Sequence, residues 1–162
     1  RDIEDQFKDT SQLILISPDV GGVVRTRAFA KRLSADLAII DKRREEPGKS
    51  EVMNVIGKVE NKICILIDDI VDSSGTLCSA AEALKKKGAK DIFSYISHGV
   101  FSGNAIKNIM KSDIKEMVIT DSILASEEVK KSKNIRHISI APLMGEAIKR
   151  IHSDSSVSAL FK

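Results

Sequence analysis

Short apolar runs rich in β-branched residues alternate along the chain with stretches whose apolar residues recur at helical spacing. The apolar runs predict strands at residues 13–16, 37–40, 63–67, 92–97, 117–120 and 135–139, with shorter strands within residues 52–59. Helical spacing predicts helices at residues 23–33, 76–87, 102–110 and 143–151. Strands and helices that alternate in this way are typical of a parallel sheet covered by helices on both faces. The pattern therefore predicts an α/β fold.

The composition is that of a globular domain. The chain has 162 residues, of which 42% are apolar and 30% charged, enough for one hydrophobic core. Its net charge of +3 suits anionic small molecules and does not by itself indicate nucleic acid, so we expect no nucleic-acid partner. No apolar run approaches the roughly 20 residues that cross a bilayer, so we expect no membrane partner. Cys64 and Cys78 lie outside any CxxC motif or histidine-rich cluster, which predicts reduced thiols in a cytoplasmic protein.

Three loops of unusual composition follow predicted strands, after Ile16, Ile40 and Ile67. In parallel α/β sheets, ligands gather at the carboxyl ends of the strands, where helices begin. We therefore expect the functional residues of this chain in these three loops.

Acidic residues dominate the beginning of the loop after Ile67. Asp68 and Asp69 follow the most apolar run in the chain, and Asp72 comes three residues later. These carboxylates would repel a phosphate, so the group that they face should be neutral or cationic. The vicinal hydroxyls of a ribose meet this requirement, and so does a hydrated Mg²⁺. The alternative is a solvated acidic turn, which three aspartates after a buried strand make the weaker interpretation.

The sequence Ser73, Ser74, Gly75 and Thr76 then opens a predicted helix. Gly75 permits the backbone to approach a ligand closely. The first amides of a helix have no partner within it, and the helix dipole favours an anion at this end. The three hydroxyls would add donors for a phosphate. The alternative is that Ser73 or Ser74 serves as an ordinary helix cap.

Residues 65–76 together resemble the ribose-phosphate signature of the type I phosphoribosyltransferase fold, and within it the chain most resembles the ribose-phosphate pyrophosphokinase family. The resemblance implies that Asp68 and Asp69 bind the ribose of ribose 5-phosphate and that residues 72–76 bind its 5-phosphate. Ser73 and Ser74 depart slightly from the family, in which many members carry Thr and a small residue there. The hydroxyl at the first of these positions is retained.

The loop after Ile16 contains Ser-Pro-Asp-Val-Gly-Gly at residues 17–22. Gly21 and Gly22 permit backbone amides to turn toward a pyrophosphate, and Asp19 is a natural ligand for Mg²⁺. Pro-Asp-x-Gly is by itself a common turn. Together with residues 65–76, this loop resembles the pyrophosphate loop of the family, which implies that Asp19 binds the metal on the nucleotide phosphates.

The loop after Ile40 is a run of charges at residues 41–48, which without context would be a solvated face. It resembles the flexible catalytic loop of the family, whose Lys-x-Arg matches Lys42 and Arg44. Their charges would neutralise a transferring diphosphoryl group without covalent chemistry, and Arg44 would also reach ribose 5-phosphate. Residues 50–57 match the pyrophosphokinase pattern as well. His98 could approach the substrate, although a structural role in a tight turn is at least as consistent with its position.

The resemblance covers residues 14–161. It implies a Mg²⁺-dependent diphosphokinase that transfers the β,γ-diphosphoryl group of ATP to the C1 hydroxyl of ribose 5-phosphate, giving phosphoribosyl pyrophosphate and AMP. Members of the family have two similar domains and form hexamers. We expect residues 1–10 to be an interdomain segment and residues 11–162 the C-terminal domain, without the N-terminal ATP-binding domain. This chain is then the ribose 5-phosphate-binding half and is inactive without the other half.

Two alternatives remain open at this point. One is a phosphoribosyltransferase that consumes phosphoribosyl pyrophosphate. The other is a non-catalytic regulator that associates with active synthetases. Such regulators tend to lose the loop cations or aspartates, so the presence of Asp19, Lys42, Arg44 and Asp68 argues against the second alternative.

Overall fold

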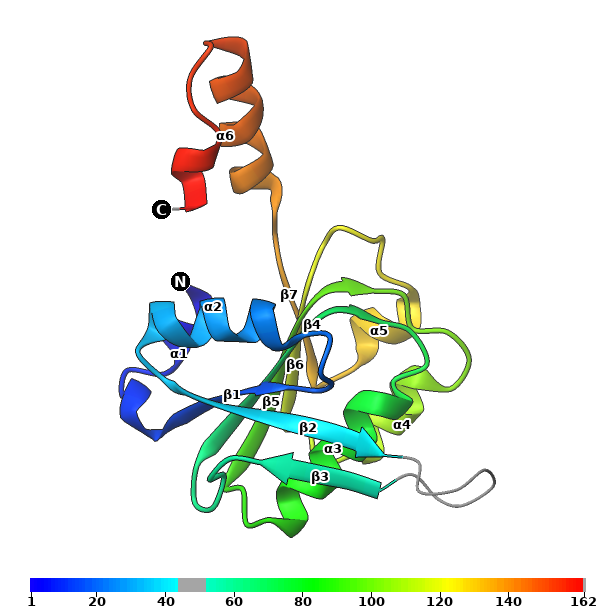
Figure 1. The fold of residues 1–162 in the computed structure, drawn as a ribbon. Helices are drawn as coiled ribbons and strands as arrows, with labels where there is room; N and C mark the ends of the chain where they lie inside the picture. Colours follow the sequence, from blue (N-terminus) through cyan, green and yellow to red (C-terminus); the bar gives the residue numbers. More distant parts are fainter. Residues whose placement is uncertain (44–51, 162) are drawn as a thin grey trace.

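The computed structural model describes residues 1–43 and 52–161 and shows in them one seven-stranded sheet with the strand order β3-β2-β1-β4-β5-β6-β7 (Figure 1). The strands are β1 (Leu13–Ser17), β2 (Asp36–Arg43), β3 (Val52–Ile56), β4 (Ile63–Val71), β5 (Asp91–Gly99), β6 (Glu116–Thr120) and β7 (Ile135–Ile138). Neighbouring strands are parallel, except that the edge strand β3 runs antiparallel to β2. The predicted α/β class and parallel sheet are therefore confirmed.

Helices cover both faces of the sheet (Figure 1). They are α1 (Asp2–Gln6), α2 (Val23–Leu33), α3 (Gly75–Lys86), α4 (Ala105–Lys111), α5 (Glu127–Lys131) and α6 (Ala141–His152), with 3-10 turns at Thr10–Gln12 and Ser158–Phe161. α1 and α2 pack on one face, and α3, α4 and α5 on the other. α6 projects away from the sheet in Figure 1 and has no buried residue.

The core has two layers because alternate residues of a strand point to opposite faces. In β1, Leu13 and Leu15 pack toward α2, whereas Ile14 and Ile16 pack toward α3, and all four are at most 1% exposed. Residues 64–67 of β4 are buried in the same alternating way, at most 2% exposed. Each such side chain contributes roughly 1.5–3 kcal/mol of burial. The centre of the sheet is thus the most firmly fixed part of the fold.

Several strands extend further than the apolar pattern predicts, β2 and β4 by the most. β2 continues through Arg43 and β4 through Val71, whereas the predicted strands end at Ile40 and Ile67. The reason is that main-chain hydrogen bonds between strands form with polar as well as apolar residues. Asp41 pairs with Asn54 of β3, and Ile70 pairs with His98 of β5. The polar residues at these strand ends therefore lie on a rigid ladder and not in free loops.

The short helix α5 is not anticipated by the sequence pattern. It has five residues and a single buried side chain, Val129, so it shows too little periodicity to be recognised. The Ser126 hydroxyl caps it by accepting the Val129 amide at 3.3 Å. In contrast, α3 ends as predicted, with Gly88 at φ +83° after a basic last turn.

The first residues of the chain pack against the sheet. Ile3 of α1 is 6% exposed within the α2 layer. Arg136 of β7 donates to both carboxylate oxygens of Asp2, at 2.9 and 2.8 Å, and the Tyr95 hydroxyl donates to Asp2 at 2.7 Å. Hydrogen bonding to Arg136 lowers the pKa of Asp2, although partial burial opposes the shift.

Among the described residues, none of the helices has the length and apolar character needed to cross a membrane.

Candidate functional site

The loop between β1 and α2 is a tight turn built on glycine. The Ser17 hydroxyl donates to the Asp19 carbonyl at 2.6 Å, and the Gly22 amide donates to Asp19 Oδ1 at 2.8 Å. A Cβ atom on Gly22 would lie 2.9 Å from Ser17 Oγ, so a larger residue would displace the Ser17 hydroxyl. Asp19 itself is exposed at the carboxyl end of β1. The predicted pyrophosphate loop is therefore a compact turn that presents a carboxylate at the start of α2.

The loop between β4 and α3 has an unusual backbone at Ser74. This residue is 4% exposed and adopts φ +68°, a left-handed conformation that non-glycine residues rarely take. Its hydroxyl donates to the Ala105 carbonyl at 3.2 Å and does not cap α3 by accepting one of its amides. The expectation that the Ser74 hydroxyl faces a ligand does not match this contact. Neither does the alternative of an ordinary serine cap, so the first amides of α3 are left for another acceptor.

The loop after β5 forms a brace, meaning a set of backbone hydrogen bonds that hold the segment between β4 and α3. The Val100 and Phe101 amides donate to the Val71 carbonyl at 2.9 and 3.3 Å, and the Ser102 amide donates to the Asp72 carbonyl at 3.2 Å. The brace depends on Gly99, where an added Cβ would lie 2.5 Å from the Phe101 ring and 2.9 Å from Ile119 Cδ1. These bonds to Val71 and Asp72, together with the hydrogen bond from Ser74 to Ala105, hold the left-handed backbone of Ser74.

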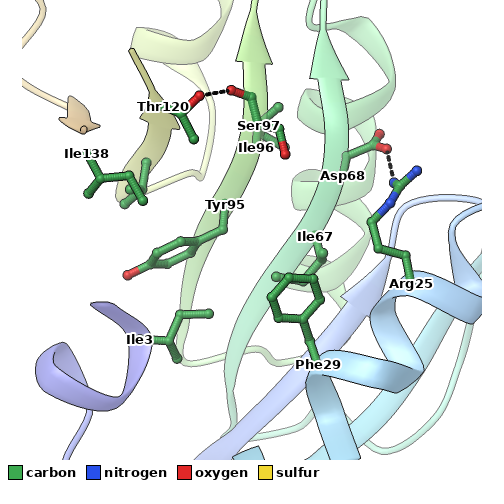
Figure 2. Close-up of a pocket in the computed structure, with 11 residues that line it drawn as sticks. Ile3, Arg25, Phe29, Ile67, Asp68, Tyr95, Ile96, Ser97, Thr120 and Ile138 are labelled. Atoms are coloured by element: carbon green, nitrogen blue, oxygen red, sulfur yellow. Dashed lines mark hydrogen bonds and ion pairs between the residues drawn. The ribbon is translucent and has the colours of Figure 1, made fainter. Parts of the chain in front are cut away.

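A single cation joins the two aspartates at the end of β4. Arg25, in the first turn of α2, donates through Nη1 to Asp68 Oδ1 at 3.0 Å and through Nη2 to Asp69 Oδ2 at 2.8 Å. Figure 2 shows its side chain reaching from α2 to Asp68. In the sequence Arg25 is one of several residues in the predicted helix at residues 23–33. The signal available in the sequence was its position one turn after the glycine loop.

The two aspartates differ in their affinity for protons. Burial raises the pKa of Asp68, and the negative charges of Asp69 and Asp19 raise it further. Slight burial opposes the shift of Asp69, but the hydrogen bond with Asp68 and the charge of Arg25 lower its pKa. The end of β4 is therefore a concentrated negative site that needs a cationic or hydrogen-donating partner.

The two loops meet in a cleft of about 200 Å³. It is lined by Asp19, Asp68 and residues 70–77. Ser74 and Leu77 are buried beneath its floor, whereas Asp72, Ser73 and Thr76 are exposed. The structure thus brings Asp19 of the first loop together with Asp68 and residues 72–76 of the third, whereas Gly21, Gly22 and Asp69 do not line the cleft.

The second loop is described in part. The backbone of Lys42 lies near the end of β2, on the next strand beyond β1. Arg44 lies outside the described residues. The predicted catalytic role of both residues remains a prediction.

Asp68 also lines a second cavity of about 200 Å³ (Figure 2). Its lining is mainly apolar and includes Ile3, Phe29, Tyr95 and Ile138, with the pair of Arg25 and Asp68 at one wall. At its rim the Thr120 hydroxyl donates to the Ser97 carbonyl at 2.6 Å. Asp68 therefore stands between a polar cleft and an apolar cavity, which accounts for its partial burial.

The histidines form no cluster that resembles a metal site. His98 is exposed, and its Nδ1 lies 2.8 Å from the Ser122 hydroxyl at the end of β6. Within residues 1–43 and 52–161, no group of three His, Cys, Asp or Glu side chains is placed to hold a metal ion. A metal at this site would need ligands from its substrate, as Mg²⁺ commonly does.

The fold and the cleft define the class of protein: a parallel α/β domain that presents carboxylates and free helix amides at the carboxyl ends of its strands. The family model of the phosphoribosyl synthetase-associated domain matches residues 44–162. The chain belongs to this family, which confirms the resemblance to the ribose-phosphate pyrophosphokinases.

Individual relatives agree with this assignment. The chain is 58% identical to the ribose-phosphate pyrophosphokinase of Agrobacterium fabrum and 59% identical to that of Bradyrhizobium diazoefficiens, over 161 residues in each case. These matches cover 99% of this chain and 52% and 50% of the relatives, so the chain spans about half their length. The crystal structure of phosphoribosylpyrophosphate synthetase from Mycobacterium smegmatis is similar with a TM-score of 0.84 at 31% identity, covering 94% of this chain and 49% of that one.

The brace behind the loop gives a first prediction. Replacing Gly99 with Ala forces the Phe101 ring to move and should lower the free energy of unfolding by about 1–3 kcal/mol. Because Phe101 and its neighbours hold the Val71 and Asp72 carbonyls, the affinity for inorganic phosphate should fall several-fold. Urea denaturation and isothermal titration calorimetry measure the two effects.

Gly145→Ala is the matched control, because nothing lies within 4 Å of a Cβ atom added there. It should leave phosphate binding unchanged. If Gly99→Ala bound phosphate as well as the unmodified chain, the brace would have no role in shaping the loop.

Proposed function

We propose that this chain is the ribose 5-phosphate-binding half of a ribose-phosphate diphosphokinase. Such an enzyme transfers the β,γ-diphosphoryl group of ATP to ribose 5-phosphate, giving phosphoribosyl pyrophosphate and AMP. The observation that carries the proposal is the cleft in which Asp19, Asp68 and the uncapped start of α3 come together. The relatives named ribose-phosphate pyrophosphokinase support it, as does the similarity to phosphoribosylpyrophosphate synthetase.

The 5-phosphate binds at the start of α3 in this proposal. The amides of Gly75 and Thr76 and the exposed hydroxyls of Ser73 and Thr76 donate to its oxygens, and Ser74 contributes its backbone. The left-handed backbone at Ser74 directs successive amides toward one point, as anion-binding turns do. Asp72, at the edge of the cleft, completes the predicted substrate-binding segment.

The ribose hydroxyls bind to the carboxylates at the end of β4. Asp68 and Asp69 accept hydrogen bonds, and a sugar diol supplies two neighbouring donors. A carboxylate next to the phosphate would repel it. In this proposal the aspartates therefore contact the ribose, and the start of α3, further along the same segment, contacts the phosphate. The sugar is then held with its C1 hydroxyl free to react.

Mg²⁺ is the cofactor in this proposal, with Asp19 as its ligand in the protein. Asp19 lines the same cleft as Asp68, and next to burial its charge contributes to the raised pKa of Asp68. Mg²⁺ prefers one or two carboxylates and completes its shell with water and phosphate oxygens, so these residues fit the ion. When bound, it supplies charge neutralisation for the ATP phosphates. Gly21 and Gly22 allow the diphosphate to lie against the backbone of the same loop.

In the transfer itself, the C1 hydroxyl oxygen of ribose 5-phosphate attacks the β-phosphorus of ATP. The bond from that phosphorus to the oxygen bridging the α- and β-phosphates breaks, AMP leaves with this oxygen, and the hydroxyl proton passes to solvent water. Lys42 and Arg44 stabilise the charge on the transferring group, and Arg44 also contacts ribose 5-phosphate. Positioning and electrostatics therefore account for the chemistry without a covalent enzyme intermediate.

The complete enzyme needs partners for this chain. Residues 11–162 would be the C-terminal domain, and residues 1–10 the segment that leads into it. ATP would bind to a second domain, equivalent to the half of the relatives that this chain does not match. We also propose a cytoplasmic homo-oligomer, a hexamer by family resemblance. The exposed apolar residues of α6 and the tail support assembly: Leu143, Met144, Ile148, Ile151 and Phe161.

Binding without turnover is the direct test. The chain should bind ribose 5-phosphate in isothermal titration calorimetry and form no AMP from ATP, Mg²⁺ and ribose 5-phosphate. Thr76→Val removes one donor to the phosphate and should weaken binding by roughly tenfold. Thr10→Val, outside the cleft, should have no effect. Absence of ribose 5-phosphate binding would refute the proposed function, and turnover at the rate of a full-length relative would refute the proposed division into halves.

The cation at the end of β2 can be tested separately. Lys42→Ala should weaken binding of Mg²⁺-pyrophosphate by about tenfold, because a charge-assisted contact to an anion is lost. Ribose 5-phosphate binding should remain within a factor of two. Lys58→Ala is the control, since Lys58 follows β3 outside the three loops. Equal pyrophosphate affinity in Lys42→Ala and the unmodified chain would remove Lys42 from the mechanism.

A further inference from the structure

Arg25 connects the beginning of α2 to the acidic residues of β4. It lies in the first turn of α2, directly after the glycine loop of residues 17–22, and its guanidinium extends to the end of β4 (Figure 2). The two nitrogens bind two different carboxylates, Asp68 Oδ1 at 3.0 Å and Asp69 Oδ2 at 2.8 Å. One planar group therefore fixes the spacing of two neighbouring acceptors, a geometry that a lysine ammonium cannot reproduce.

The two carboxylates need such a cation. They are adjacent in sequence, and the charge of Asp19 in the same cleft adds to their repulsion. Asp68 is half-buried, and its burial favours the protonated acid, which would turn an acceptor into a donor. The positive charge of Arg25 opposes this repulsion, because it lowers the pKa of Asp69 and lies 3.0 Å from Asp68 Oδ1. Arg25 thus adds a cation to the pair and fixes the spacing of its two oxygens.

A ribose diol is the ligand that this arrangement suits. Two adjacent hydroxyls offer two donors at a fixed separation, and both must meet ionised oxygens to donate at the same time. A sugar that lacks the 2-hydroxyl leaves one carboxylate without its donor, which is costly at a partly desolvated site. Selection between the two sugars therefore depends on how well both carboxylates are held.

We propose that Arg25 is a positioning residue that sets the preference of this site for ribose 5-phosphate over 2-deoxyribose 5-phosphate. It acts through Asp68 and Asp69, because its two contacts hold one oxygen of each carboxylate at a fixed spacing for the diol. The inference rests on the proposed function, since it assigns Arg25 a role in recognising that substrate. It adds a determinant on α2 to a sugar site otherwise built from the β4 segment.

An ordinary surface ion pair would behave differently. The side chains of Arg25, Asp68 and Asp69 are 37%, 20% and 55% exposed, and ion pairs this accessible contribute little to stability. Loss of Arg25 should therefore leave the fold intact. A role in recognition appears instead as a change in the ratio of two affinities, which a general loss of stability does not produce.

The experiment compares Arg25→Gln, Arg25→Lys and the control Arg27→Gln in the same chain. Arg27 lies on the same helix and is exposed, and it lines neither the cleft nor the apolar cavity that Arg25 lines. Isothermal titration calorimetry gives the affinities for ribose 5-phosphate, 2-deoxyribose 5-phosphate and inorganic phosphate, and thermal denaturation checks the fold. The unmodified chain and Arg27→Gln should prefer the ribose compound by about tenfold or more, as expected for one charge-assisted hydrogen bond.

In Arg25→Gln the preference should fall to about twofold or less, while the affinity for inorganic phosphate stays the same. Arg25→Lys should retain part of the preference, since it restores the charge but not the two-carboxylate contact. If Arg25→Gln does not fold, Arg25→Lys decides the question by the same ratio.

Three results would overturn the inference. An undiminished preference for ribose 5-phosphate in both Arg25 variants would show that Asp68 and Asp69 select the sugar without Arg25. A parallel loss of inorganic phosphate affinity would show that Arg25 binds the phosphate itself. Failure of the unmodified chain to bind ribose 5-phosphate would remove the proposed function and the inference together, whereas the first two results leave the proposed function standing.

Discussion

Burial of β4 between β1 and β5 is the constraint on which the site depends. Residues 64–67 are almost fully buried on both faces, and the pairing with β5 continues past them through Val71. The acidic residues that follow the buried segment therefore cannot move independently of the sheet. Their carboxylates, the turn at Ser74 and the first amides of α3 occupy fixed places because one strand carries them out of the core.

The charges of the site follow from this rigidity. A half-buried Asp68 beside two other carboxylates is unfavourable unless cations or hydroxyl donors meet it. The protein supplies Arg25 from α2, and the uncapped start of α3 leaves a positive helix end a few residues further along. A substrate with a diol at one end and a phosphate at the other matches both features. In the proposed function, the same segment therefore holds the sugar at its acidic end and the phosphate at the start of α3.

The sequence predicted what depends on local pattern, including the central strands, α2, the start of α3 and the two loops with glycine. It could not predict contacts between distant segments. The partners of Arg25 lie 43 and 44 residues along the chain, and no local pattern connects them. The Ser74 hydroxyl, on a residue with a left-handed backbone, donates to the carbonyl of Ala105, which lies 31 residues along the chain. The extensions of β2 and β4 likewise depend on neighbouring strands, because their polar ends carry no apolar periodicity.

The central claim is that the β4 to α3 segment binds ribose 5-phosphate, and amide chemical shifts in a ¹H–¹⁵N NMR titration test it most directly. The account predicts that the largest shifts on addition of ribose 5-phosphate fall on residues 68–76, with the amides at the start of α3 prominent among them. Inorganic phosphate should reproduce the shifts of residues 73–76 but not those of Asp68 and Asp69. Shifts concentrated on α6 and the C-terminal tail, with residues 68–76 unchanged, would contradict it.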